Sequence, residues 1–193
     1  MIRRRSPLCN TLHKGYFSKS LYTLSDFPDL DHQNCPSCRT RGMYRPHGFY
    51  ERYVVDFYGG GPVILLVRIL RVRCNCRRTH ALLLDSLIPY CQYSLRFILQ
   101  VLKMYFRHSR TVEGICDFFQ IAPPTLYRLK RLFLEHRELW LGLLRSQKSP
   151  LPFLQFLCKA PDLSGNLATF FRRFRISFLQ SHAEPAYSQR KGS

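Results

Sequence analysis

The hydrophobic pattern of the chain changes character near Pro89, from a β-type pattern to a helical one. Residues 50–58 and 63–72 are rich in aromatic and β-branched residues. Gly59-Gly60-Gly61-Pro62 separates the two runs, so this part of the chain predicts a β-hairpin with a glycine turn.

The second strand of this hairpin changes along its length. Val67 and Ile69 have the same parity as Arg71 and Arg73, so one face is apolar at first and charged towards the end. The pattern predicts a strand that leaves the core before Cys74.

Beyond Pro89 the apolar residues follow a helical period. They recur three and four positions apart, at Leu95, Ile98, Leu99, Leu102 and Phe106. Two further helices fit residues 112–131, with a continuation to Ser149-Pro150, and a last helix fits residues 166–179.

The fold class expected from these patterns is α+β. We predict a loosely structured lead-in at residues 1–34 and a hairpin module at residues 35–89. An all-helical domain follows at residues 90–180, and residues 181–193 are predicted to form a disordered tail.

The charge of the chain indicates a polyanionic partner. Lys and Arg number 30 against 12 Asp and Glu, which gives a formal net charge of +18. The basic residues recur through the patterned segments, which favours nucleic acid, whereas a ribosome-associated protein or a charge for solubility is the plain alternative. No apolar run predicts a secretory signal or a membrane span, so we expect a cytoplasmic protein without a membrane partner.

Four cysteines in two close pairs predict a metal site. Cys35 and Cys38 form a Cys-x-x-Cys pair before the hairpin, and Cys74 and Cys76 follow its second strand. Two such pairs around a hairpin are typical of a zinc ribbon, so we expect one zinc ion per chain. Because only Asn75 separates the second pair, either Cys76 or His80 is a candidate fourth ligand.

The alternatives for these residues are structural. The four cysteines can also be buried thiols without a metal, and His80 can be a histidine that only forms a hydrogen bond. The other cysteines lack this pairing, and we expect core or surface thiols at Cys9, Cys91, Cys116 and Cys158.

Residues 111–131 have the spacing of a helix-turn-helix. Counting Val112 as the first position, apolar residues occupy the fourth, eighth, tenth, fifteenth and eighteenth positions: Ile115, Phe119, Ile121, Leu126 and Leu129. Proline is tolerated in a first helical turn, so Pro123 and Pro124 indicate the start of the second helix.

The second of these helices is the predicted DNA-reading helix. Its candidate contacts to duplex DNA are Pro124, Thr125, Tyr127, Arg128, Lys130 and Arg131. An ordinary helical hairpin with a solvated basic face is the alternative.

These features together resemble an uncharacterised, transposase-related bacterial family known as domain of unknown function 6431. The resemblance covers about residues 35–135. It is carried by Cys35-Pro36-Ser37-Cys38, Arg71-Val72-Arg73-Cys74, Thr79-His80-Ala81-Leu82-Leu83, Pro89-Tyr90 and the helix-turn-helix. In that family the second cysteine pair is normally Cys-x-x-Cys, one residue longer than here. The resemblance implies mobile-element ancestry and DNA binding, and no known reaction.

The expected function is that of a targeting or regulatory DNA-binding component of a mobile element, and not of an enzyme. A transposase or nuclease needs acidic residues to hold divalent metal ions, and after the helix-turn-helix only Glu135, Glu138, Asp162 and Glu184 are present. A separately encoded transposase is therefore a candidate partner. The basic, aromatic residues 170–179 keep RNA binding and membrane-surface binding as alternatives.

Overall fold

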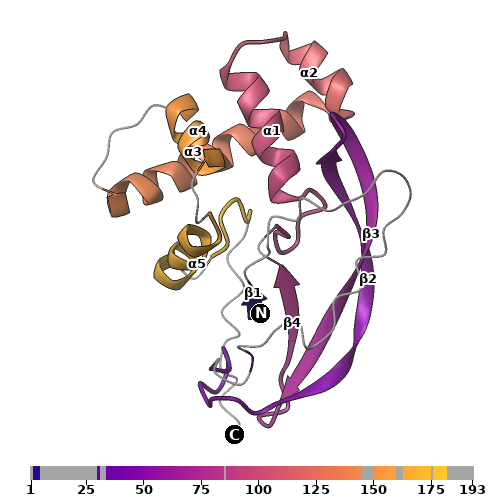
Figure 1. The fold of residues 1–193 in the computed structure, drawn as a ribbon, viewed down its shortest axis with the longest axis vertical. Helices are drawn as coiled ribbons and strands as arrows, with labels where there is room; N and C mark the ends of the chain where they lie inside the picture. Colours follow the sequence, from indigo (N-terminus) through magenta and orange to yellow (C-terminus); the bar gives the residue numbers. More distant parts are fainter. Residues whose placement is uncertain are drawn as a thin grey trace, which may run out of the picture.

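The computed structural model describes residues 2–4, 30, 34–84, 86–144, 150–159, 163–174 and 176–181. It confirms the predicted α+β class, with a long hairpin along one side and helices beside its upper part (Figure 1). In chain order the elements are β1 (Ile2–Arg4), β2 (Tyr44–Tyr58), β3 (Gly61–Cys74), β4 (Thr79–Leu84), α1 (Leu95–Phe106), α2 (Val112–Phe119), α3 (Pro123–Leu144), α4 (Pro150–Lys159) and α5 (Leu163–Phe174).

The predicted hairpin is present and is longer than its sequence pattern. β2 and β3 pair in antiparallel fashion from Tyr44 opposite Cys74 to Tyr58 opposite Gly61. Gly59 and Gly60 alone form the turn, with φ angles of 62° and 90°, the backbone of a type I′ turn. The turn therefore requires glycine at two positions, and β3 already begins at Gly61.

Two shorter strands complete the sheet, whose order is β1-β4-β3-β2. β4 pairs antiparallel with β3, and β1 pairs parallel with β4. The structure describes a strand at Ile2–Arg4 within residues 1–34, for which the sequence predicts a loosely structured lead-in. A three-residue strand is too short to show a period, and its partner lies far away in the sequence.

The buried face of β3 changes part-way along the strand. Val67 and Ile69 are buried, but further on Val72 and Cys74 are buried and Arg73 is exposed. The change coincides with a bulge in β2 between Pro46 and Phe49, where two residues face one on β3. β3 has no extra residue of its own, so its side chains still alternate, and it is the opposite face that is buried beyond Leu70, where pairing with β4 begins at Arg71.

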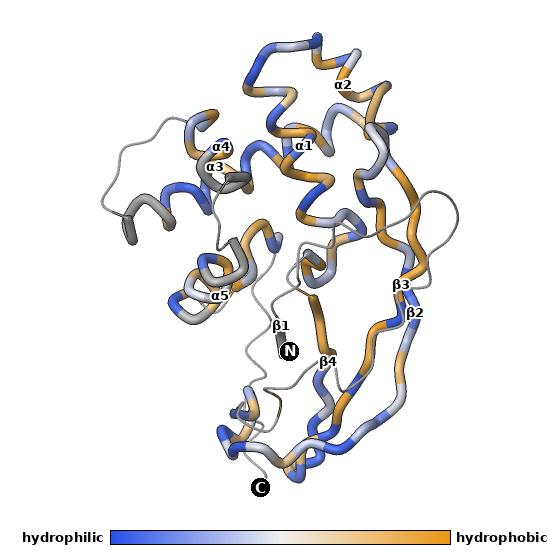
Figure 2. The backbone as a smooth tube through the Cα atoms, in the orientation of Figure 1, coloured by the Kyte–Doolittle hydropathy of each residue, from blue (hydrophilic) through white to orange (hydrophobic). Residues whose placement is uncertain are grey.

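Among the residues that the structure describes, the buried apolar side chains form two clusters. The sheet cluster contains Val54, Val67, Ile69, Val72, Leu82, Leu83 and Leu87. The larger cluster lies among the helices, whose apolar positions are visible in Figure 2, and it includes Phe97, Phe119, Phe133, Phe153 and Phe170.

Near the glycine turn, β2 is hydrogen-bonded to the segment that leads into α1. The Val55 amide donates to the Gln92 carbonyl at 2.7 Å, and the Ser94 amide donates to the Val55 carbonyl at 2.9 Å. The buried Asp56 carboxylate accepts from the Ser94 hydroxyl and lies 3.5 Å from the Arg96 guanidinium. Since Ser94 also caps α1, this contact fixes the hairpin to the start of that helix.

The C-terminal helix ends earlier than predicted. The sequence pattern predicts a helix over residues 166–179, but α5 ends at Phe174. The apolar residues beyond it, Phe178 and Leu179, turn back into the helical core and are buried. Of the predicted tail at residues 181–193, all but Ser181 lies outside the described residues. Within the described part of the chain, no helix combines the length and apolar character needed to cross a bilayer.

His136 holds this returning segment. Its Nδ1 accepts a hydrogen bond from the Leu179 amide at 2.8 Å, and its ring contacts those of Phe170 and Phe178. The side chain is buried, and burial lowers the pKa of His136 to about 4. His136 is therefore neutral in the folded protein at pH 7.

We expect acidification to destabilise the protein through His136. An unfolded histidine has a pKa of about 6.5. Between pH 6.5 and pH 4 the His136 ring is therefore protonated in the unfolded state but neutral in the folded state. Neutral His136 stabilises the folded protein fully above pH 6.5, and this stabilisation is lost as the pH falls towards 4. The loss is at most about 3 kcal/mol. Urea denaturation at pH 7.5, 6 and 4.5 measures it. His136→Asn keeps an acceptor but not the titration, so a pH dependence equal to that of the wild type would contradict the assignment.

Candidate metal centre and nucleic-acid interface

The first cysteine pair lies in a tight loop that its own backbone closes. The Arg39 amide donates to the Cys35 carbonyl at 2.8 Å, and the Cys35 amide donates to the Thr40 carbonyl at 2.9 Å. Arg39 has a left-handed backbone, with φ of 62°. This loop, the first knuckle, presents the Cys35 and Cys38 side chains to the same side.

The second cysteine pair forms a knuckle of the same design with one residue fewer. It is the connection between β3 and β4. The Arg77 amide donates to the Cys74 carbonyl at 2.8 Å, the Cys74 amide donates to the Arg78 carbonyl at 2.9 Å, and Arg77 has φ of 66°. Both closing hydrogen bonds and the left-handed arginine are kept, so the missing residue shortens only the segment between Cys74 and Cys76.

The two knuckles bring four sulfur atoms together. The Sγ atoms of Cys35, Cys38, Cys74 and Cys76 all lie within 4.8 Å of one another. Across the knuckles, Cys35 is 3.8 Å from Cys76 and Cys38 is 3.6 Å from Cys74. Four sulfur donors at these distances are compatible with a bound metal ion, as the sequence predicted.

His80 lies beside this cluster. Its Nε2 is 3.3 Å from the Cys35 sulfur, and β3 holds it in place because His80 pairs with Val72. Burial is the main cause that lowers the pKa of His80 to about 4, so the ring is neutral. The structure thus places the Cys76 sulfur within the group of four donors, and the imidazole next to one of them.

Tyr44 is a residue of this site that the sequence did not suggest. Its ring meets the His80 ring edge-on, with 6.1 Å between the centroids. Its hydroxyl is buried and has no hydrogen-bond partner among the described residues. Burial, followed by the charge of the four nearby cysteines, raises the pKa of Tyr44. Its place at the start of β2, opposite Cys74, comes from the strand register, which the sequence pattern did not predict.

The thiols of the cluster differ in acidity. Hydrogen bonds from the Thr40 side chain and backbone lower the pKa of Cys38 to about 6. For Cys74, the hydrogen bond from the Cys76 backbone lowers the pKa, but burial and the neighbouring cysteines outweigh it and raise it to about 12. Like charges at this spacing repel, so four thiolates need a cation between them.

The remaining cysteines have surroundings of other kinds. Cys116 is buried between helices and Cys91 is half-buried, and burial raises the pKa of both thiols. Cys9 and the Cys158 side chain lie outside the described residues.

The second site consists of α2, a tight turn and the first turns of α3. All five apolar positions of the predicted pattern are buried: Ile115, Phe119, Ile121, Leu126 and Leu129. Gln120 ends α2 with a left-handed backbone, and the Ile121 amide donates to the Cys116 carbonyl at 3.0 Å. Thr111 caps the start of α2. The chain therefore reverses within a few residues, and α3 begins at Pro123.

The residues predicted to contact DNA lie on different sides of α3. Pro124, Tyr127, Arg128 and Arg131 are exposed, with 49% of Tyr127 accessible. Arg131 pairs with Glu135 at 3.7 Å. Thr125 and Lys130 are half-buried.

Lys130 faces α1. Its Nζ donates to the Tyr105 hydroxyl at 2.9 Å and lies 5.0 Å above that ring. Arg128, two residues earlier, extends to the opposite side of the helix, so the two basic side chains lie on different surfaces of α3.

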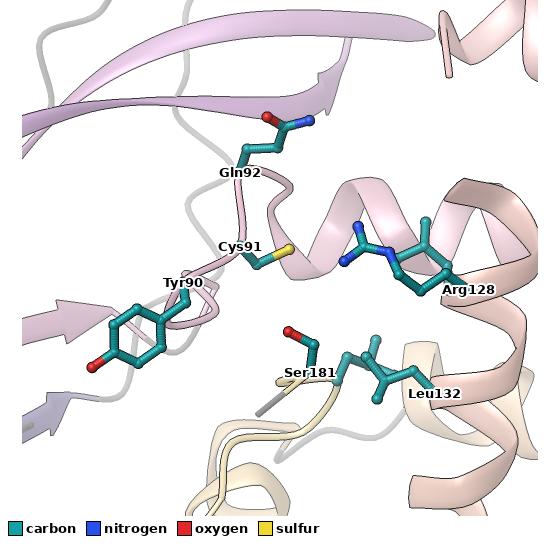
Figure 3. Close-up of a pocket in the computed structure, with 8 residues that line it drawn as sticks. Tyr90, Cys91, Gln92, Arg128, Leu132 and Ser181 are labelled. Atoms are coloured by element: carbon teal, nitrogen blue, oxygen red, sulfur yellow. The ribbon is translucent and has the colours of Figure 1, made fainter. Parts of the chain in front are cut away.

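Arg128 borders a cavity of about 330 Å³ between α3 and the segment before α1. In Figure 3 its guanidinium points towards Cys91 and Gln92. Tyr90, which is 70% exposed and has φ of 57°, borders the same cavity. In the sequence Tyr90 contributes only to the family resemblance, and neither Tyr90 nor Gln92 was predicted to lie beside Arg128.

One comparison with known proteins gives a match. Residues 35–127 match the family model described as Domain of unknown function (DUF6431). The matched segment is just under half of the chain, and it contains both knuckles, the hairpin, α1, α2 and the start of α3. No curated protein and no solved structure matches this chain.

Proposed function

We propose that this chain is a sequence-specific DNA-binding protein, in which α2 and α3 form a helix-turn-helix and α3 enters the major groove. The observation that carries the proposal is the arrangement of α3. Leu126 and Leu129 bury one side of its start, while Tyr127 and Arg131 are exposed on the other. Arg128 is exposed as well, and its guanidinium, which borders the cavity beside Cys91, would turn outward to reach a base. The net charge of +18 attracts a polyanion such as DNA, and the exposed basic face of α3 is suited to contact it.

The loop before α2 supports the same orientation. Arg107 and Arg110 are exposed there, and Thr111 caps the helix that they precede. Basic side chains at the start of the first helix are placed to contact backbone phosphates, which fix the register of a protein on DNA. The second helix then supplies the contacts to base edges.

We infer that the metal at the four cysteines is zinc. With Zn–S bonds of about 2.3 Å, the sulfurs of a tetrahedral site lie about 3.8 Å apart. The two distances across the knuckles, 3.8 Å and 3.6 Å, fit that spacing. Cys35, Cys38, Cys74 and Cys76 would hold the ion, and His80 would then donate a hydrogen bond to the Cys35 thiolate. Bound zinc would neutralise thiolate charge and cross-link the knuckles, a structural role.

The biological role that we propose is that of a targeting or regulatory component of a mobile element. It rests on the resemblance to transposase-related proteins. The chain would act without a catalytic domain of its own, with a separately encoded transposase as partner. An active transposase or nuclease is the alternative, and cleavage of a bound duplex in the presence of Mg²⁺ would favour it.

RNA binding or membrane-surface binding through residues 170–179 is the second alternative. Phe170, Phe178 and Leu179 are buried in the helical core. They are therefore not available for stacking on bases or for insertion into a lipid surface, which favours the α3 proposal over this one.

The identity of the fourth zinc ligand leads to a direct prediction. Zinc-refolded wild type is expected to contain about one zinc per chain, and Cys76→Ser to lose it. His80→Gln is expected to retain zinc and to bind it about 10- to 100-fold more weakly, as expected for a partner of a ligand. Metal analysis and competition with a chromogenic chelator measure both. Loss of zinc in His80→Gln with retention in Cys76→Ser would exchange the two roles.

The function itself is tested by selection from random duplexes with the purified, zinc-loaded protein. The proposal expects one enriched sequence, bound at least about 10³-fold more tightly than unrelated duplex at physiological salt. Single-stranded RNA and anionic vesicles are the parallel arms. Equal binding of all duplexes, or tighter binding of RNA or vesicles, would contradict the proposal.

A further inference from the structure

The end of the hairpin that carries the two knuckles is rich in arginine and free of acidic residues. We call residues 34–46 and 71–80 the knuckle end. Neither range contains Asp or Glu, and together they contain Arg39, Arg41, Arg45, Arg71, Arg73, Arg77 and Arg78. All of these except the half-buried Arg71 are exposed. The knuckle end therefore concentrates positive charge far from the helices.

Two of these arginines occupy backbone positions that favour glycine. Arg39 and Arg77 each follow the second cysteine of a knuckle, with φ of 62° and 66°. A side chain with a Cβ atom is strained in this left-handed region, and glycine is not. Both knuckles thus have arginine where the backbone alone would select glycine.

The knuckle end also contains an unfavourable pair of like charges. Arg45 on β2 lies directly opposite Arg73 on β3, and both side chains are exposed. Like charges directly opposite on neighbouring strands destabilise a sheet. A polyanion bound across the two strands would remove this repulsion. Arg39 and Arg77, the two arginines with strained backbones, would contact the same polyanion.

The knuckle end and α3 lie at opposite ends of the hairpin. At the glycine end, the Phe57 ring contacts Phe118 and Phe119 of α2. The knuckles lie at the other end of β2 and β3 (Figure 1). β3 has 14 residues, and at about 3.4 Å per residue the separation along the strand is at most roughly 45 Å. This length corresponds to at most roughly 13 base pairs of duplex DNA, about one helical turn.

We propose that the knuckle end is a second DNA-contact surface, which binds backbone phosphates of the same duplex about one helical turn from the bases that α3 reads. This proposal rests on the proposed function of α3. The knuckle end would add affinity and fix the direction of the protein on its site, without choosing the sequence.

The test compares variants on two duplexes that contain the selected site. The long duplex has 20 base pairs on each side, and the short set removes the flanks one side at a time. Arg39→Gly with Arg77→Gly removes two charges and relaxes two left-handed residues, and Arg45→Gln with Arg73→Gln removes the opposed pair. Arg173→Gln, an exposed arginine of α5, is the control for charge.

On the long duplex, each double variant is expected to lower the slope of log K against log salt by about two. A fourfold rise in salt would then weaken the wild type roughly 12-fold more than the variant. The difference is expected to disappear when one particular flank is removed, and the melting temperature is expected not to fall. Arg173→Gln should match the wild type.

Two kinds of failure can be told apart. If the wild type selects a duplex sequence but both double variants keep its affinity and slope, the knuckle end does not contact DNA while α3 does. The same conclusion follows if the variants lose affinity equally with and without flanks, or if the knuckle end binds single-stranded RNA instead. If the wild type selects no sequence, the proposed function fails, and this inference fails with it.

Discussion

Removal of the zinc ion that we propose at the four cysteines is expected to unfold the knuckle end of the hairpin and to leave the helices folded. Most of β2 from Tyr44 to Tyr53 is exposed, and the sheet cluster is small, so burial alone stabilises this region weakly. Zinc bound to four thiolates contributes an apparent free energy of about 10–16 kcal/mol in small domains. The helical core is separate from this cluster, and its five large phenylalanines are fully buried.

NMR spectra recorded with and without a strong chelator measure this effect. Amide signals from residues 34–46 and 71–80 are expected to collapse to unfolded positions, while those of α1, α2 and α3 persist. Cys35→Ser should reproduce the change without chelator. Cys91→Ser, the same atomic change outside the cluster, should have no such effect. An unchanged spectrum in Cys35→Ser would show that the cysteines are plain buried thiols.

The parts of the fold that the sequence predicted are those with local causes. Two glycines in a type I′ turn predict a hairpin because few other residues adopt that backbone. The three- and four-residue spacing of the apolar positions in α1 predicts a helix because it produces one buried face. For the same reason, the five apolar positions around Gln120 were identified correctly as buried.

The parts that the sequence did not predict depend on distant partners. β1 forms by pairing with β4, and the buried face of β3 changes where β4 begins to pair with it and where β2 has a bulge. The choice between Cys76 and His80 depends on whether a knuckle can lose one residue and keep its closing hydrogen bonds. The spacing of cysteines in the sequence does not show whether the shorter backbone loop can still form these hydrogen bonds.

The second large effect is expected at α3. Arg128→Ala should weaken binding to the selected duplex by about 1–3 kcal/mol, or 5- to 150-fold, and relax the preference at one base pair, since a bidentate contact to guanine would be lost. Arg131→Ala should lower affinity for all duplexes and reduce the salt slope by about one, because a phosphate contact would be lost. Titrations of the selected duplex and of its single-base variants measure both changes.

The structure adds a matched control for these substitutions. Lys130 is directed at the Tyr105 hydroxyl and not outward, so Lys130→Ala should affect stability more than base preference. All three variants should keep the helical circular dichroism of the wild type. If neither Arg128→Ala nor Arg131→Ala changes duplex binding, α3 is not the reading helix.

The most direct test of the central claim is methylation interference on the selected duplex. Methylation of guanine N7 blocks the major-groove edge that arginine recognises. The proposed major-groove contact predicts strong interference at one or more guanines of the site, and it predicts that Arg128→Ala abolishes the interference at one of them and leaves the others. Interference that is absent for the wild type, or identical for the wild type and Arg128→Ala, would contradict the claim that Arg128 of α3 reads the sequence.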